Sequence, residues 1–293
     1  MTVIGIFGPT ASGKSRVSEA VAAQVPAELV SADAMQVYEG LPILTNQTPA
    51  RLVAIWPLAH EASVGAYAPL AHAAVDEILA AGRTPIVVGG TGLYFRAALG
   101  VLRLPPAAPA GARRRWERLY DEDRDEAVRV LRERDPRAAA IHPNDRRRIV
   151  RALELAELGA TLRPETPELW SDDYRHPTLV VGLDVPKRVL DARIEERTRA
   201  MFEQGVQEEV RAAVRQPLSS TARKTLGLDE VARLPAAEAE RAIVVRTRRY
   251  AAYQRKWMRR IAGIAMVAAD RSTEEVAADI VELARARERL SRR

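Results

Sequence analysis

Short apolar runs alternate along this chain with longer stretches in which apolar residues recur at helical spacing. The apolar runs are rich in β-branched residues and end at turn signals, as buried strands do; they are VIGIF (3–7), ELVSAD (28–33), TPIVVGGTG (84–92) and TLVVGLD (178–184). Alanine-rich helical stretches follow at residues 15–25, 93–99 and 188–214. The alternation predicts βαβ units, a parallel sheet covered on both faces, and therefore an α/β fold.

The strand pattern stops between residues 103 and 176. The proline-rich stretch LPPAAPAG (104–111) leads there into charged sequence with helical periodicity. We therefore expect an all-helical insertion domain over 103–176, within a core made of 1–102 and 177–293. Further along, residues 238–260 predict a long basic helix, and residues 264–270 and 273–290 predict a last strand and a last helix.

Composition excludes several kinds of chemistry. The 293 residues include no cysteine and four scattered histidines, which rules out disulfides, cysteine-ligated zinc and a cysteine nucleophile, so any metal must be held by oxygen. No apolar run approaches the roughly 20 residues that span a bilayer, and the chain starts with a strand pattern and no basic leader. We expect a globular, cytoplasmic protein with no membrane association.

The charge balance allows two explanations. The formal net charge is +6, and only four of the 45 basic residues are lysines. Abundant arginine reflects either a compositional bias or a surface for phosphates and nucleic acid. The placement of the arginines must decide between the two.

GPTASGKS (8–15) carries the most specific local signal. Gly8, Gly13, Lys14 and Ser15 fit G-x-x-x-x-G-K-[ST], with a strand pattern before and a helical pattern after. Glycines let backbone N–H groups surround a phosphate, Lys14 adds a positive charge, and the Ser15 hydroxyl can ligate Mg²⁺. Unless the match is accidental, the motif predicts a polyphosphate ligand, which need not be a nucleotide such as ATP.

Two further strand ends place candidate functional residues at the same edge of the predicted sheet. Asp33 follows the second strand, where a carboxylate is a Mg²⁺ ligand, a general base, or only a turn or helix cap. The third strand ends in Gly89, Gly90, Thr91 and Gly92. Phosphate-loop hydrolases usually place an aspartate at such a strand end, so these glycines weaken an ATPase interpretation.

Two arginine patterns remain open on the sequence alone. Arg193 and Arg197 lie four residues apart on one helical face, where they either reach one anion or form a solvated face with neighbouring glutamates. Arginines also alternate with Tyr250, Tyr253 and Trp257. Such a helix either stacks on RNA bases or docks by its aromatic face.

Six stretches together resemble the tRNA dimethylallyltransferase (tRNA isopentenyltransferase) family, in family order and at close to family spacing. They are GPTASGKS, SADAMQVY, GGTGLYFRA, IHPNDRRRIVRALE, RIEERTRAMFEQGVQEEV and RTRRYAAYQRKW. The resemblance runs through nearly the whole chain. It implies a core like that of P-loop kinases, a helical insertion that grips the anticodon stem-loop of tRNA, and a bacterial-type enzyme, for which a monomer is the simplest expectation.

The resemblance also implies an activity and a set of site residues. The activity is transfer of a dimethylallyl group from dimethylallyl diphosphate to N6 of the adenine beside the anticodon, with Mg²⁺ as the cofactor. The implied catalytic residues are Asp33 as general base, Thr91 and Lys14. The implied diphosphate ligands are Gly8, Thr10, Ala11, Ser12, Gly13, Lys14, Ser15 and Arg197, with Ser15 also on the metal. The implied tRNA contacts are Asp33, Ala34, Met35, Gln36, Thr91, Arg113, Arg147, Arg148, Ile149, Val150, Arg151 and Lys224.

Departures from the family pattern leave room for different activities. Ala34 stands where many members have serine, and PILTNQTP (42–49) and KTLGLDE (224–230) replace the usual segments. A free nucleotide is an alternative acceptor for the same donor, as in adenylate isopentenyltransferases, although the arginine-rich insertion favours RNA. A small-molecule kinase that uses ATP would also carry the phosphate loop. An RNA-binding protein that has lost its chemistry would also show the altered segment after Asp33.

Overall fold

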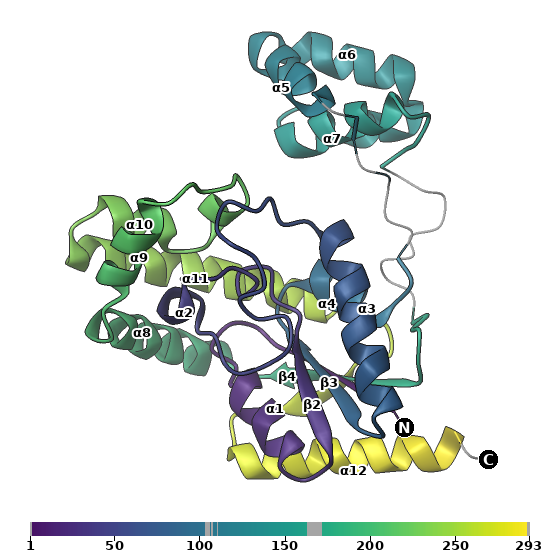
Figure 1. Ribbon diagram of the computed structural model, residues 1–293, viewed down its shortest axis with the longest axis vertical. Coiled ribbons are helices and arrows are strands. Elements are labelled where there is room, and N and C mark those ends of the chain that lie inside the picture. Colours follow the sequence, from purple (N-terminus) through teal and green to yellow (C-terminus); the bar gives the residue numbers. More distant parts are fainter. Residues whose placement is uncertain (1, 103–105, 107, 110, 163–171, 292–293) are drawn as a thin grey trace. The chain divides into compact units, whose positions relative to one another are not determined.

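The computed structural model describes residues 2–102, 106, 108–109, 111–162 and 172–291. The chain divides into two compact units, Met1–Val101 with Trp170–Arg293, and Leu102–Leu169 (Figure 1). The sequence placed the second boundary at residue 176. Tyr174 instead pairs with Gly100 in an antiparallel bridge, and the Arg175 N–H donates to the Leu99 carbonyl at 2.9 Å, so this segment belongs to the first unit.

A parallel sheet forms the centre of the first unit, which confirms the predicted α/β class. In the described part its order is β2-β3-β1-β4-β5, and each neighbouring pair is parallel. The bounds are β1 Val3–Phe7, β2 Ala27–Ser31, β3 Thr84–Gly89, β4 Thr178–Asp184 and β5 Ala265–Ala268. All residues of β1 are buried because it lies between β3 and β4.

Alternation along β1 supplies the cores on both faces of the sheet. Val3 and Phe7 pack into one apolar cluster, whereas Ile4 and Ile6 pack into the other, as expected when successive side chains point to opposite faces. The first cluster holds residues of α3 and α4, and the second holds residues of α1 and α12 (Figure 1). The bounds of these helices are α1 Lys14–Ala22, α3 Val64–Ala80, α4 Gly92–Leu99 and α12 Thr273–Ser291.

The remaining helices of this unit correct one expectation. Their bounds are α2 Pro42–Thr45, α8 Lys187–Glu203, α9 Val206–Val214, α10 Leu228–Arg233 and α11 Ala236–Met258, with a 3₁₀ turn at Ala222–Lys224. The single helix expected over 188–214 is interrupted at Gly205, whose φ of 92° ends α8 and starts α9. α3 was not singled out from the sequence.

The second unit is all helical in its described part, as predicted. Its elements are α5 Ala112–Glu122, α6 Arg124–Arg134, a 3₁₀ turn at Pro136–Ala140 and α7 Arg146–Ala156. Carboxylates cap two of these helices, because Asp123 accepts from the Glu126 N–H at 2.9 Å and Asp145 from the Arg148 N–H at 3.2 Å. An apolar cluster that includes Trp116, Leu131 and Leu153 forms the core of this unit.

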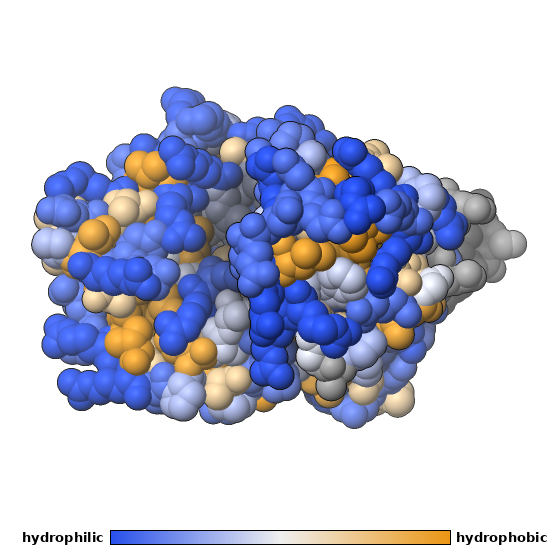
Figure 2. All heavy atoms as spheres, turned by 90° about the horizontal axis from the view of Figure 1, so that it is seen from above, coloured by the Kyte–Doolittle hydropathy of each residue, from blue (hydrophilic) through white to orange (hydrophobic). Residues whose placement is uncertain are grey.

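The surface of the protein is largely polar. Figure 2 shows hydrophilic side chains over most of the face in view, with small apolar patches between them. Among the described residues, no helix combines the length and hydropathy that a membrane crossing requires.

Candidate active site

A tight loop joins β1 to α1 and carries the phosphate-binding motif. Gly13 precedes α1 with a φ of 88° and offers no side-chain cap, so the first N–H groups of α1 are left for a ligand. Gly8 is required for a different reason: a Cβ there would lie 2.5 Å from Ser12 Oγ. The Gly8 N–H also donates to the Gly89 carbonyl at 3.3 Å, which ties the loop to the end of β3.

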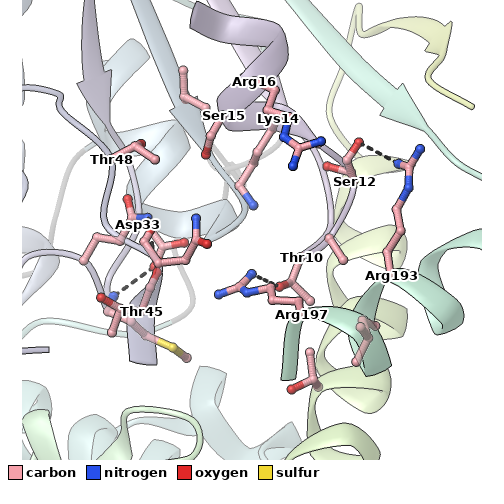
Figure 3. A pocket seen from close by; sticks show the side chains of 18 of the residues that line it. Thr10, Ser12, Lys14, Ser15, Arg16, Asp33, Thr45, Thr48, Arg193 and Arg197 are labelled. Carbon is pink, nitrogen blue, oxygen red and sulfur yellow. Dashed lines mark hydrogen bonds between the residues drawn. The ribbon is translucent and has the colours of Figure 1, made fainter. Parts of the chain in front are cut away.

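The loop opens into a cavity of about 510 Å³ at the carboxyl edge of the sheet. Thr10 to Ser15 line one part of this cavity, and Asp33 and Arg197 also line it. Figure 3 shows the Lys14 amine pointing into the space that separates Asp33 from Arg197. The structure thus brings together most residues predicted to bind the diphosphate and the predicted general base; Gly8 fixes the loop from behind.

Two enclosed cations, Lys14 and Arg197, share the carboxylate of Asp33 in this cavity. Burial lowers the pKa of Lys14 to about 8, against the opposing attraction of Asp33. Burial also lowers the pKa of Arg197, again opposed by Asp33. Enclosed positive charge in excess of negative charge favours an anionic ligand, because such a ligand restores the stabilisation that water would have supplied.

Arg193 and Arg197 of α8 both contact the phosphate loop. Arg197 Nη1 donates to Thr10 Oγ1 at 3.1 Å, and Arg193 Nη1 donates to the Ser12 carbonyl at 3.5 Å (Figure 3). The sequence left open whether these arginines reach one anion or form a solvated face, and the structure supports the first interpretation because both contact the loop. Arg197 reaches the cavity that holds Lys14, as its predicted role requires.

Asp33 and Thr91 both bond to the turn that follows β2. Asp33 Oδ1 accepts from its own turn, from the Met35 N–H at 2.9 Å, and its Oδ2 has no partner among the described residues. Thr91 Oγ1 accepts from the Ala34 N–H at 3.3 Å and lies 3.3 Å from the Tyr250 hydroxyl. One carboxylate oxygen is therefore held by the backbone while the other is left to act on a ligand.

The basic helix α11 docks on this edge by three side chains. Gln254 is 1% exposed; its Oε1 accepts from the Thr10 N–H at 2.8 Å, and its Nε2 donates to the Gly90 carbonyl at 2.9 Å. A Cβ on Gly92 would lie 2.0 Å from Trp257 Cε3, so the indole packs directly on the backbone of α4. Of the two interpretations of this helix, docking therefore accounts for Tyr250 and Trp257. Tyr253 is 55% exposed, so its ring is accessible for stacking on an RNA base. Sequence reasoning missed Gln254.

The segment after Asp33 folds back on itself. Met35 and Gln36 both line the cavity. The Gln36 side chain also bonds within its own loop, where Nε2 donates to the Asn46 carbonyl at 2.8 Å and Oε1 accepts from Ser31 Oγ at 2.8 Å. Gln36, predicted to contact tRNA, thus supports the loop with its side chain. Lys224 lies exposed on the 3₁₀ turn before α10.

The predicted tRNA contacts in the second unit fall into three groups. The Ile149 and Val150 side chains are 1% and 2% exposed in its apolar core, so they stabilise α7, and contact of these two residues with tRNA stays a prediction. Arg113 and Arg151 pair with the buried Glu154, each at 2.9 Å. Arg147 and Arg148 are exposed. The periodicity of α7 indicates which of its side chains are buried, because its apolar positions share one helical face.

Comparisons with known proteins agree with this geometry. A family model described as IPP transferase matches residues 36–261. The tRNA dimethylallyltransferase of Salinispora arenicola is 40% identical over 97% of this chain and 87% of its own, and that of Salinispora tropica is 41% identical over 88% and 86%.

Solved structures extend the similarity to the whole described fold. The full-length tRNA isopentenylpyrophosphate transferase of Bacillus halodurans aligns with a TM-score of 0.72 and 28% identity, covering 100% of this chain and 99% of its own. A eukaryotic dimethylallyltransferase acting on tRNA shares the fold with a TM-score of 0.80 at 24% identity, covering 100% and 80%. The chain therefore belongs to the IPP transferase family.

Proposed function

We propose that this protein transfers the dimethylallyl group of dimethylallyl diphosphate to N6 of the adenine adjacent to the anticodon of tRNA, and releases diphosphate. The observation that carries the proposal is the gathering of the phosphate loop, Arg197 and Asp33 around one cavity. Relatives at about 40% identity bear the name tRNA dimethylallyltransferase. Nothing in the comparisons favours a free adenine nucleotide as the acceptor.

The cationic side of the cavity suits a departing diphosphate. When the bond between the allylic carbon and the diphosphate oxygen breaks, the electron pair and its negative charge stay on the diphosphate. Lys14, Arg197 and the N–H groups at the start of α1 are fixed where that charge develops, and preorganised donors of this kind lower the barrier. An anionic ligand would also offset the burial that lowers the pKa of Lys14.

The opposite side suits activation of the amine. The new bond joins N6 to the allylic carbon, and N6 loses one proton, which must go to a base within hydrogen-bond reach. Asp33 Oδ2 is the acceptor that we propose, since Oδ1 is held by the Met35 N–H. The Thr91 hydroxyl, held between Ala34 and Tyr250, would orient the amine.

The donor set also fits the proposed Mg²⁺. The Ser15 hydroxyl lies in the cavity with Lys14, and a hydroxyl beside diphosphate oxygens and water is an environment that Mg²⁺ prefers. When bound, Mg²⁺ would supply positive charge to the leaving diphosphate.

Transfer to labelled products tests the proposal against its rivals. The protein with Mg²⁺ would be incubated with radiolabelled dimethylallyl diphosphate and either an anticodon stem-loop or AMP. We expect label in the RNA, and loss of at least about 100-fold of the rate in Asp33→Asn with diphosphate binding retained. Label in AMP alone, or ATP consumption without transfer, would overturn the proposed acceptor or the proposed reaction.

RNA binding by the second unit has its own test. We propose that Arg147 and Arg148 contact RNA phosphates, because they are the exposed arginines at the start of α7. Replacing both with alanine should weaken stem-loop binding and reduce its salt dependence by about one unit of slope per lost contact, without affecting the donor. Arg132→Ala, an exposed arginine of α6, is the control. Equal loss of donor affinity would contradict this division of roles.

A further inference from the structure

A four-residue helix forms part of the cavity wall. The helix is α2, Pro42–Thr45, and its residues Ile43, Leu44 and Thr45 line the cavity. It lies in the segment where this sequence departs from the family pattern. One turn of helix is unstable alone, since it fixes several residues for very few hydrogen bonds. Something outside α2 must therefore hold it in place.

Glu209 of α9 supplies that support. Its Oε2 accepts from the Ile43 N–H at 2.7 Å, and its Oε1 accepts from the Leu44 N–H at 2.8 Å. The preceding residue, Leu41, offers no side-chain cap. Both carboxylate oxygens thus cap a helix that lies more than 160 residues away in sequence, and an ionised cap at a helix N-terminus is the stronger kind.

Further contacts of α2 leave it little freedom. Burial raises the pKa of Glu209, while the two N–H donors favour the ionised form. At the far end of the helix, Gln36 Nε2 donates to the Thr45 and Asn46 carbonyls at 3.3 and 2.8 Å. A Cβ on Gly227 would lie 2.8 Å from Leu44 Cδ1, so the Leu44 side chain also packs closely against the start of α10.

Apolar residues line the cavity where α2 stands. Ile43 and Leu44 contribute from α2, and further apolar lining comes from Met35, Met201, Leu226 and Ile243. Figure 3 shows Thr45 across Lys14 from Thr10 and Arg197, so the α2 wall faces the cationic side. A ligand with a charged diphosphate and a short hydrocarbon chain matches this division.

We propose that Glu209 is a positioning residue that holds α2 against the hydrocarbon chain of the donor and so limits the length of chain accepted. This inference rests on the proposed function. Glu209 acts through α2 and does not itself line the cavity. Removing the carboxylate frees two helical N–H groups, which loosens the wall and leaves the phosphate loop intact.

Two ligands distinguish an effect on the α2 wall from an effect on the phosphate loop. Calorimetric titration would compare dimethylallyl diphosphate with inorganic diphosphate in wild type, Glu209→Ala and Glu209→Gln. We expect Glu209→Ala to lose about tenfold in affinity for dimethylallyl diphosphate and less than about twofold for inorganic diphosphate. Glu209→Gln should fall between, because its amide oxygen still accepts one N–H. Glu208→Ala, the exposed neighbour paired with Arg211, is the matched control.

Chain-length selectivity supplies the second readout. The ratio of kcat/KM for geranyl diphosphate to that for dimethylallyl diphosphate should rise at least about tenfold in Glu209→Ala. Ile43→Ala, which shortens the wall and keeps the cap, should raise the same ratio and replaces Glu209→Ala if that variant does not fold. An equal loss of affinity for both ligands, or an unchanged ratio of the two kcat/KM values, would overturn the inference. Wild-type protein that transfers neither chain overturns the proposed function instead.

Discussion

We expect Lys14 to lower the stability of the ligand-free protein and to strengthen binding of the ligand. Burial lowers the pKa of Lys14 from 10.5 to about 8, so the folded state disfavours the charged amine relative to the unfolded chain. Lys14→Met keeps the length of the side chain and removes the charge. We therefore expect the variant to be more stable than wild type at pH 7 and to bind diphosphate about 10- to 100-fold more weakly.

The magnitude and its pH dependence follow from the same pKa. A full shift of this size corresponds to about 3 kcal/mol, at about 1.4 kcal/mol per pH unit, and partial access of water to Lys14 reduces the expected gain to about 1–2 kcal/mol. Between pH 8 and 10.5 the unfolded chain binds more protons than the folded one, so the stability of wild type rises with pH there. The advantage of the variant is present below pH 8 and disappears as pH approaches 10.5.

Denaturant unfolding of both proteins at pH 7, 8, 9 and 10 measures this difference. Lys256→Met, an exposed lysine on α11, is the control and should change the free energy of unfolding by less than about 0.5 kcal/mol. A variant that is less stable than wild type at pH 7, or a difference that stays constant up to pH 10, would refute the reasoning.

Three further substitutions test contacts away from Lys14. Gln254→Leu should lower the free energy of unfolding by about 2 kcal/mol in denaturant titration, because two buried backbone groups lose their partner. Gly92→Ala should displace Trp257, seen as a changed fluorescence emission maximum, since its Cβ would overlap the indole. Glu154→Ala should speed hydrogen exchange in α5 and α7 by leaving Arg113 without its buried partner; unchanged exchange would contradict this.

Local signals in the sequence were sufficient for the phosphate loop and the sheet. The spacing of Gly8, Gly13 and Lys14 identifies the loop within eight residues of sequence, although its side-chain contacts come from Arg197 and Gln254. Asp33 could be placed beside this loop because parallel strands present their carboxyl ends at one edge. The fold class followed from alternation of strand and helix patterns, which local propensity and burial largely determine.

Contacts between distant segments could not be predicted from local sequence signals. Gln254 and Glu209 hold backbone groups 244 and about 165 residues away, and nothing near either residue indicates its partner. Trp257 shows a related limit, since the same alternation of arginine and aromatic residues suits docking on glycine and stacking on a base. The break at Gly205 had a local signal, because glycine commonly ends a helix.

The hydrogen bond from Thr10 to Gln254 also bears on synthesis. The phosphate loop is translated before the other site segments of this chain, but its anchor is made 244 residues later, on a helix that ends at Met258. A nascent chain shorter than this holds β1 and the motif without the amide that joins Thr10 to Gly90. The first site element to be translated is therefore one of the last to be completed.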